Sequence, residues 1–151
     1  MGYKVIINSN KIKFSACHFL KEPRKCSRLH GHNYYVSVEL EDELDDNYFV
    51  DDFIKLKKNI KEIVKHLDHF ILIPEEAPYL KFKKDQTSVE VLTSNKRYVF
   101  PLSEVKFLPI PASTSELLAK YIHSKVKEIY KDKKISVKLE ESKDAIAVYE
   151  D

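Results

Sequence analysis

Strict alternation of apolar and polar residues in two early segments is the feature that most constrains how this chain can fold. Successive side chains of a β-strand point to opposite faces, so each segment predicts a strand with one buried face. The first segment lies within residues 3–20, with a break near Asn8-Ser9-Asn10, and the second spans residues 33–41. The positions in the apolar phase are Ile12, Phe14, Ala16 and His18 in the first segment and His32, Tyr34, Val36, Val38 and Leu40 in the second. Two neighbouring antiparallel strands with histidines on their buried face are therefore expected.

Two helices are predicted from apolar residues that recur every three or four positions. Asp51 or Asp52 is suited to be the N-cap of the first helix, and the second begins at Ser113 or Thr114. Ser113 and Glu116 have the spacing of a capping box, which gives Glu116 a structural role. The expected buried stripes are Phe53, Leu56, Ile60, Ile63, Val64 and Leu67 in the first helix and Leu118, Tyr121, Ile122, Val126 and Ile129 in the second.

The remaining segments complete an α+β pattern. Residues 74–112 hold most of the prolines and predict a loop with a hairpin, in which residues 88–92 pair with residues 97–100. Two short strands, residues 135–141 and 145–149, close the chain. This order of elements predicts a single α+β domain, with an antiparallel sheet and both helices on one face.

Composition and charge exclude several classes of function. The formal net charge of +2 gives no reason to expect a nucleic-acid or membrane partner, and the apolar runs are far too short to span a bilayer. The first residues lack the apolar stretch of a signal peptide, and the only cysteines are Cys17 and Cys26, so a cytoplasmic protein without a disulfide scaffold is expected. The only glycines, Gly2 and Gly31, cannot build a glycine-rich phosphate loop or a dinucleotide-binding motif.

Three histidines share one side of the two predicted strands. His30 joins His18 and His32 if the second strand extends back to it, and Gly31 leaves room for a bend there. Three neutral imidazoles bind zinc and leave a fourth position for water or substrate, which is typical of a catalytic site. Two alternatives remain open. The histidines could be separate core residues satisfied by hydrogen bonds, or Cys26 could close a structural zinc site as the fourth ligand.

Cys26 lies four residues before His30 in a loop rich in cations. Nearby positive charge lowers the pKa of a thiol and favours the thiolate, which can act as a base or a nucleophile. The same cations could instead form a solvated surface or receive an anionic substrate such as a phosphate ester. Cys17, on the opposite strand face from His18, is expected to serve packing only. The cations around Cys26 are Lys21, Arg24, Lys25 and Arg28.

Two further sites along the chain carry ionisable side chains that could take part in catalysis or binding. Asp68 and His69 directly follow the first helix and could form a proton-transfer pair, although a histidine near a helix end also suits the helix dipole. Glu141 continues the apolar phase of the strand at residues 135–141, and an inward carboxylate needs a cation, a hydrogen bond or a ligand. A bulge at the strand end would instead turn it outward. His123 is expected on the surface of the second helix.

Together these residues resemble the family of 6-pyruvoyl-tetrahydropterin and 6-carboxy-tetrahydropterin synthases. The unit Cys-x-x-x-His-Gly-His at residues 26–32, combined with His18 upstream, is the specific part of the resemblance. The stretch at about 75–107 is longer than a minimal member needs and is interpreted as an insertion in a single domain, residues 1–151. The other matching segments are residues 14–18, 33–34, 50–57, 67–69, 114–119 and 141–142.

The resemblance implies a tunnelling fold (T-fold), in which a four-stranded antiparallel sheet carries two helices on one face. It also implies trimers that stack into a homo-hexamer, a dimer of trimers, with active sites between subunits. Zn²⁺ would be bound by His18, His30 and His32. The metal would hold side-chain oxygens of the substrate, 7,8-dihydroneopterin triphosphate.

The resemblance further implies a role for each of the other candidates. Cys26 would be the base that removes a carbon-bound proton, with Asp68 and His69 as its proton relay. Glu141 would anchor the pterin ring through the N–H donors of the ring. The remaining pterin contacts would come from the backbone near Thr114 and Ser115, with Glu116 beside the pterin pocket.

The three-residue gap between Cys26 and His30 resembles the 6-carboxy-tetrahydropterin synthase branch, because the pyruvoyl-forming branch typically has a longer gap. The implied reaction converts dihydroneopterin triphosphate to 6-carboxy-5,6,7,8-tetrahydropterin, with release of acetaldehyde and triphosphate. It is a step toward 7-deazaguanine nucleosides of the queuosine type. The alternatives are formation of 6-pyruvoyl-tetrahydropterin, cleavage of the side chain to a hydroxymethyl-dihydropterin, and a non-catalytic, zinc-stabilised assembly module.

Overall fold

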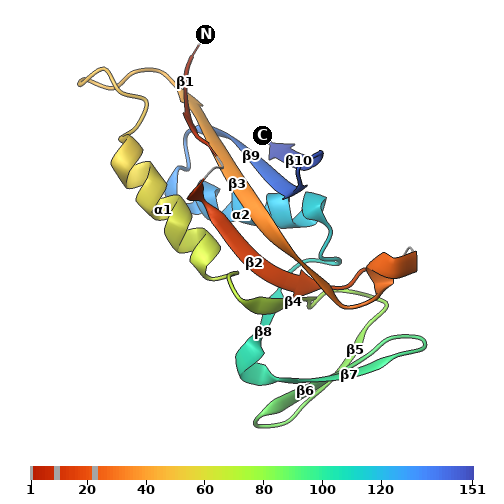
Figure 1. Ribbon diagram of the computed structural model, residues 1–151. Helices are drawn as coiled ribbons and strands as arrows, with labels where there is room; N and C mark the ends of the chain where they lie inside the picture. Colours follow the sequence, from red (N-terminus) through yellow and green to blue (C-terminus); the bar gives the residue numbers. More distant parts are fainter. Residues whose placement is uncertain (1, 9–10, 22–23) are drawn as a thin grey trace.

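A computed structural model describes residues 2–8, 11–21 and 24–151 (Figure 1). The main sheet runs in the order β10-β9-β3-β2-β4-β8, and β1 also pairs with β3. Of the break expected near Asn8-Ser9-Asn10, Ser9 and Asn10 lie outside the described residues. The strands of the main sheet are β1 (Tyr3–Ile7), β2 (Lys13–His18), β3 (His30–Asp42), β4 (Phe70–Pro74), β8 (Val105–Leu108), β9 (Lys134–Ser142) and β10 (Ala145–Glu150).

Four strands of the main sheet, β10, β9, β3 and β2, are antiparallel neighbours, as the α+β prediction requires. β4 joins β2, and β8 joins β4, in parallel, so the complete sheet is mixed. The sequence pattern did not indicate β4, because residues 70–74 form one apolar run that ends in proline. A largely buried strand loses the alternation that identifies a strand in sequence.

The two helices, α1 (Phe53–Lys65) and α2 (Ser115–Ile129), pack on the main sheet and against each other (Figure 1). Their buried side chains share one apolar core with the inward residues of β2, β3 and β9, so both helices cover the same face. The predicted stripes are largely confirmed, but Phe53 and Ile129 at the helix ends are 52% and 47% exposed. No helix in the described part of the chain is long and apolar enough to cross a membrane.

The N-caps of the helices agree only partly with the sequence prediction. Asp52 caps α1 as expected and accepts hydrogen bonds from amides of its first turn. Thr114, not Ser113, caps α2, and its hydroxyl accepts the amide of Leu117 at 3.4 Å. The capping box is therefore wrong: with Thr114 at the cap, the third helical residue is Leu117, and Glu116 is exposed. Ser113 is instead buried just before the helix.

Three strands between β4 and β8 form a separate antiparallel sheet, called here the second sheet: β5 (Lys81–Lys84), β6 (Ser88–Leu92) and β7 (Arg97–Pro101) (Figure 1). The predicted hairpin is confirmed as β6 and β7, and β5 is an additional strand. The second sheet has its own apolar cluster, which includes Phe19. The ring of Phe19 stacks on Tyr98 with centroids 4.9 Å apart. Because Phe19 directly follows His18, the second sheet lies beside the end of β2.

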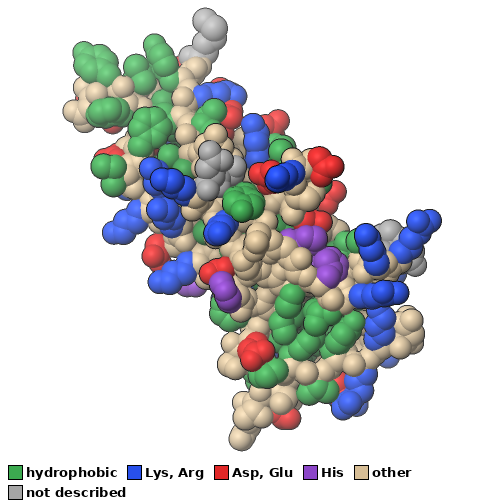
Figure 2. Space-filling view, viewed as in Figure 1, with side chains coloured by type: hydrophobic (Ala, Val, Ile, Leu, Met, Phe, Trp, Pro, Cys, Tyr) green, Lys and Arg blue, Asp and Glu red, His purple; other side chains and the backbone are tan. Residues whose placement is uncertain are grey.

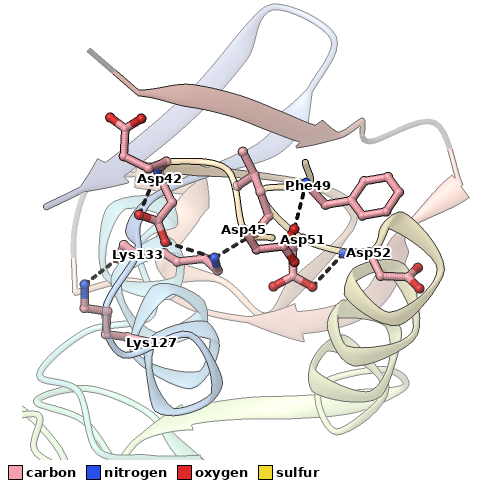
Figure 3. Close-up of polar contacts among 9 residues, drawn as sticks. Asp42, Asp45, Phe49, Asp51, Asp52, Lys127 and Lys133 are labelled. Carbon is pink, nitrogen blue, oxygen red and sulfur yellow. Dashed lines mark hydrogen bonds and ion pairs between the residues drawn. The ribbon is translucent and has the colours of Figure 1, made fainter. Parts of the chain in front are cut away.

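Lys133 lies in the turn before β9 and forms hydrogen bonds with the segment that connects β3 to α1 (Figure 3). Its ammonium donates to the carbonyl of Val50 at 2.7 Å and to Oδ2 of Asp42 at 3.0 Å. Within the connection, Oδ1 of Asp45 accepts the amide of Phe49 at 3.0 Å. These bonds hold the chain where it enters α1.

His123 is buried, which contradicts the expectation that it lies on the surface of α2. Its Nε2 is 2.8 Å from Oδ1 of Asp151, and the same oxygen accepts the amide of Ile135 at 3.0 Å. Nζ of Lys127 donates to the other carboxylate oxygen of Asp151 at 2.6 Å. A polar partner from the end of β10 thus makes burial of His123 possible, and helical periodicity alone could not reveal that partner.

Candidate functional site

His18, His30 and His32 lie together where β2 and β3 pair. His18 is opposite His30 in the strand register, and His32 is opposite Ala16. One ring nitrogen of each histidine lies within 4.8 Å of the others. The strand phase thus anticipated this arrangement, which we call the three-histidine cluster. Three rings in mutual contact are not separate core histidines.

Backbone carbonyls set the orientation of two of these rings. Nδ1 of His18 is 2.8 Å from the carbonyl oxygen of Ser113, and Nδ1 of His30 is 2.7 Å from that of Arg28. A carbonyl oxygen only accepts hydrogen bonds, so Nδ1 carries the proton and Nε2 keeps its lone pair. A carbonyl on the outer nitrogen is the usual support of a metal-binding histidine. Ser113 therefore orients His18, a role that its apparent capping motif concealed.

His32 presents a buried nitrogen that lacks a partner. Its Nε2 forms no hydrogen bond with any described residue, although Oε1 of Glu141 is 3.4 Å away. A buried ring nitrogen without a partner is unfavourable unless a ligand completes it. An unpartnered buried nitrogen of this kind fits a metal ligand.

Burial keeps the imidazoles of His18 and His32 neutral. Desolvation lowers the pKa of His18 to about 4, and it also lowers the pKa of His32. Neutral imidazole is the form that binds a metal ion. The residues therefore fit a three-histidine zinc site, in which backbone carbonyls occupy the outer nitrogens of His18 and His30 and Nε2 of His32 is without a partner among the described residues.

Cys26 is not part of the metal-ligand group found among the described residues, which contains the three histidines only. It lies half-buried in the short 3₁₀ helix η2 (Arg24–Ser27), and its carbonyl accepts the amide of Leu20 at 2.9 Å. This arrangement does not support the closed structural site in which Cys26 is the fourth ligand. It leaves the thiol free for another role.

Tyr34 closes the buried side of the cluster. Its hydroxyl is 3.3 Å from Nε2 of His18, and its ring stacks on Phe14 with centroids 4.8 Å apart. Burial raises the pKa of Tyr34, so the hydroxyl stays protonated. From the sequence Tyr34 was expected only as a core residue, although it shares the strand phase of His32 and therefore lies on the same face of β3 as the cluster.

Glu141 reaches the cluster from the end of β9. Ser115, the first residue of α2, donates its hydroxyl to Oε2 of Glu141 at 2.5 Å. The start of a helix also favours a nearby negative charge. The carboxylate is 31% exposed, so a ligand can reach it. Thr114 caps the same helix end, whereas Glu116 is exposed and forms no contact with Glu141 among the described residues.

Asp68 and His69 form a pair, as the sequence suggested. Oδ2 of Asp68 is 2.9 Å from Nδ1 of His69, and its Oδ1 accepts the amide of Ser15 at 2.8 Å. Burial acts to raise the pKa of Asp68, but these two contacts outweigh it and hold the pKa below its ordinary value. His69 has a left-handed backbone, with φ of 62°, and its amide donates to the carbonyl of Ser15 at 2.6 Å.

The Asp68–His69 pair lies at the surface of the chain. The side chain of His69 is 81% exposed at the edge of a hollow of about 710 Å³, which Cys17 and Asn33 also line. No contact joins Asp68 or His69 to Cys26 in the described part of the chain. A single copy of the chain therefore shows no contact between the two halves of the expected proton relay.

The chain matches the family described as 6-pyruvoyl tetrahydropterin synthase over residues 8–151. It belongs to this family. A relative from Methanocaldococcus jannaschii, a putative 6-carboxy-5,6,7,8-tetrahydropterin synthase, is 34% identical over 122 residues, which is 80% of this chain and 75% of the relative. The dihydroneopterin monophosphate aldolase of Pyrococcus furiosus is 41% identical over 59 residues, 39% of this chain and 50% of that enzyme.

The fold of the family is also the fold of this chain. The 6-pyruvoyl tetrahydropterin synthase of Plasmodium falciparum superposes with a TM-score of 0.92 at 28% identity, over 99% of this chain and 98% of that one. This coverage includes the residues of the second sheet. The T-fold expected from the sequence is thereby established.

Proposed function

We propose that this chain is a zinc-dependent 6-carboxy-5,6,7,8-tetrahydropterin synthase. It would convert 7,8-dihydroneopterin triphosphate and water to the 6-carboxy product, acetaldehyde and triphosphate, a step toward 7-deazaguanine nucleosides. The observation that carries the proposal is the three-histidine cluster with the reachable carboxylate of Glu141 beside it. Relatives that bear this enzyme name, from Aquifex aeolicus and Bacillus subtilis among others, support this branch.

In this proposal His18, His30 and His32 hold the zinc ion. Zinc bound there supplies a Lewis acid that polarises an oxygen of the substrate side chain next to the carbon that loses its proton. The carbonyls of Ser113 and Arg28 keep two of the rings aimed at the shared centre. Tyr34 excludes water from the buried side of the cluster.

Glu141 binds the pterin ring. An ionised carboxylate accepts two parallel N–H donors, and the aminopyrimidinone edge of a pterin offers such a pair. The hydroxyl of Ser115 holds the carboxylate in place at the start of α2. Since Oε1 of Glu141 is 3.4 Å from Nε2 of His32, a pterin bound to Glu141 would lie next to the histidines that would hold the zinc ion.

Cys26 acts as the base toward a carbon-bound proton, and the Asp68–His69 pair completes the relay from a neighbouring subunit. The exposure of His69 and the separation of the pair from Cys26 within one chain support an active site between subunits. The homo-hexamer that the resemblance implies, a dimer of trimers, provides such interfaces.

A second candidate is cleavage of the pterin side chain, because the Pyrococcus furiosus relative is named a dihydroneopterin monophosphate aldolase. The two reactions would use the same metal and the same carboxylate anchor. They differ in the bond that breaks after proton removal, so the products distinguish them. Formation of 6-pyruvoyl-tetrahydropterin is a third outcome of the same chemistry.

Replacement of Cys26 separates the enzyme from a structural zinc module. Cys26→Ala should keep about one zinc ion per chain, because the metal ligands are the histidines. Its turnover of dihydroneopterin triphosphate should fall at least about 100-fold, the usual effect of removing a general base. Cys17→Ala, which removes the other thiol, is the matched control and should keep both zinc and turnover.

Metal analysis and a turnover assay on the unaltered protein, Cys26→Ala and Cys17→Ala distinguish an enzyme from a structural zinc module. Loss of zinc in Cys26→Ala, together with no turnover by the unaltered protein, would contradict the proposal. Cys26 would then be a zinc ligand, and the chain would be an assembly module.

A further inference from the structure

A cleft of about 650 Å³ lies between the loop that carries Cys26 and the second sheet, and we call it the basic cleft. One wall comes from the residues that follow β2 and from η2, and the other comes from β5 and the β6–β7 turn. The function proposed above does not use it. The lining residues are Phe19, Leu20, Lys21, Ser27, Pro78, Tyr79, Lys81, Leu92, Thr93, Ser94, Asn95 and Lys96.

The charge of the basic cleft differs from that of the chain as a whole. Its lining contains Lys21, Lys81 and Lys96 and no acidic residue, whereas the whole chain has 26 basic and 24 acidic residues. Lys21 and Lys81 form no ion pair with any residue that the structure describes. Cations gathered along a cleft create an electrostatic field that attracts an anion.

Lys96 forms the bridge between the two walls. Its Nζ donates to the carbonyl of Ser27 at 2.8 Å and to the hydroxyl of the same residue at 3.4 Å. An ammonium group has three N–H donors, so one remains for a ligand oxygen. The β6–β7 turn is thereby attached to the residue that follows Cys26, and the second sheet shapes the cleft.

Tyr79, which lines the basic cleft, carries an unsatisfied polar group. Its hydroxyl is buried and has no hydrogen-bond partner among the described residues. A buried hydroxyl without a partner is unfavourable, and an acceptor oxygen of a ligand would satisfy it. An anion with several oxygens suits both this donor and the three ammonium groups.

The basic cleft adjoins the three-histidine cluster. Phe19 and Leu20 directly follow His18, so the cleft begins within two residues of a metal-site ligand, at most about 7 Å of extended chain. Figure 2 shows histidine side chains next to Lys and Arg side chains that continue toward the second sheet on the same face. An extended substrate can therefore occupy both places at once.

We propose that the basic cleft binds the triphosphate group of the substrate, with Lys21, Lys81 and Lys96 as its cationic contacts. This inference rests on the proposed function for the identity of the substrate. It gives the second sheet a role in specificity, because β5 and the β6–β7 turn supply two of the three lysines.

Binding of inorganic tripolyphosphate to the zinc-loaded protein tests this site without any turnover. The double variant Lys21→Ala/Lys81→Ala should bind tripolyphosphate about 100-fold more weakly, since each lost contact to a charged group accounts for about tenfold. Lys83→Ala, an exposed lysine of β5 outside the cleft, is the control and should bind as the unaltered protein does. Titration calorimetry measures the dissociation constants, and metal analysis verifies equal zinc content.

The result that overturns the subsite is equal affinity in the double variant and the Lys83→Ala control. Turnover assays then separate this inference from the proposed function. The KM for dihydroneopterin triphosphate should rise in the double variant only, and an equal KM in both variants would remove the subsite and leave the function intact. Lysine-dependent binding of tripolyphosphate without turnover of any pterin would retain a polyphosphate site and reject the proposed function.

Discussion

At the scale of single residues, groups outside the three-histidine cluster set its chemistry. The carbonyls of Ser113 and Arg28 fix which nitrogen of His18 and His30 carries the proton. Tyr34 and the surrounding core remove water from His18, which is almost fully buried. The cluster is therefore preorganised for a cation before any metal arrives.

The depressed pKa of His18 has a consequence for the stability of the metal-free protein. Its pKa is about 4 in the folded chain and about 6.5 in the unfolded chain. Between these values the unfolded chain binds a proton that the folded chain does not, so the free energy of unfolding decreases as the pH falls. The expected loss between pH 7 and pH 4.5 is about 2–3 kcal/mol, since one pKa unit corresponds to about 1.4 kcal/mol.

Urea unfolding of the metal-free protein at the two pH values measures this loss. In His18→Gln, which cannot bind the proton, the decrease should be smaller by that amount. His66→Gln, which changes an exposed histidine at the end of α1, should behave as the unaltered protein does. An identical decrease in His18→Gln and the unaltered protein would show that the burial of His18 has no such effect.

At the scale of elements, alternation and helical periodicity in the sequence were sufficient for the part of the fold that carries the site. β2, β3 and β9 each have one buried and one less buried face, so their phase placed the histidines and Glu141. β4 could not be found in this way, because its apolar residues do not alternate. The parallel pairing of β4 with β2 depends on contacts between residues far apart in the chain.

Polar partners distant in sequence account for the other errors. His123 looked like a surface residue because its partner, Asp151, lies at the far end of β10. Ser113 looked like a helix cap because its spacing to Glu116 fits a capping box, but its hydroxyl donates to the carbonyl of Phe19 and its carbonyl contacts His18, so Thr114 caps α2 instead. The basic cleft could not be predicted from the sequence either, because Lys21 and Lys81 line one cleft only when the second sheet folds against the residues that follow β2.

At the scale of the whole molecule, one copy of the chain contains all the proposed groups but does not bring all of them into contact. Asp68 and His69 lie at the surface, whereas Cys26 lies in the loop between β2 and β3. An interface between copies of the chain would bring the two halves together. Homo-oligomers with head-to-tail contacts in a ring create such mixed sites repeatedly.

Mixing of two inactive variants tests whether the site is shared. Cys26→Ala and His69→Ala should each lose turnover as pure oligomers. After co-expression, about a quarter of the interfaces should pair an intact Cys26 with an intact His69 by random assembly, so about a quarter of the activity should return. A mixture that stays inactive, although size and mass measurements show mixed oligomers, would place the base and its relay in one subunit.

Product analysis of the purified, zinc-loaded protein with dihydroneopterin triphosphate shows whether the chain is a 6-carboxy-5,6,7,8-tetrahydropterin synthase. We expect the substrate to be consumed and the masses of 6-carboxy-5,6,7,8-tetrahydropterin and acetaldehyde to appear, and we expect both products to be lost when a chelator removes zinc. A hydroxymethyl-dihydropterin or a 6-pyruvoyl product would contradict the proposed branch. No consumption of the substrate by the zinc-loaded oligomer would contradict the proposal that this chain is a pterin side-chain lyase.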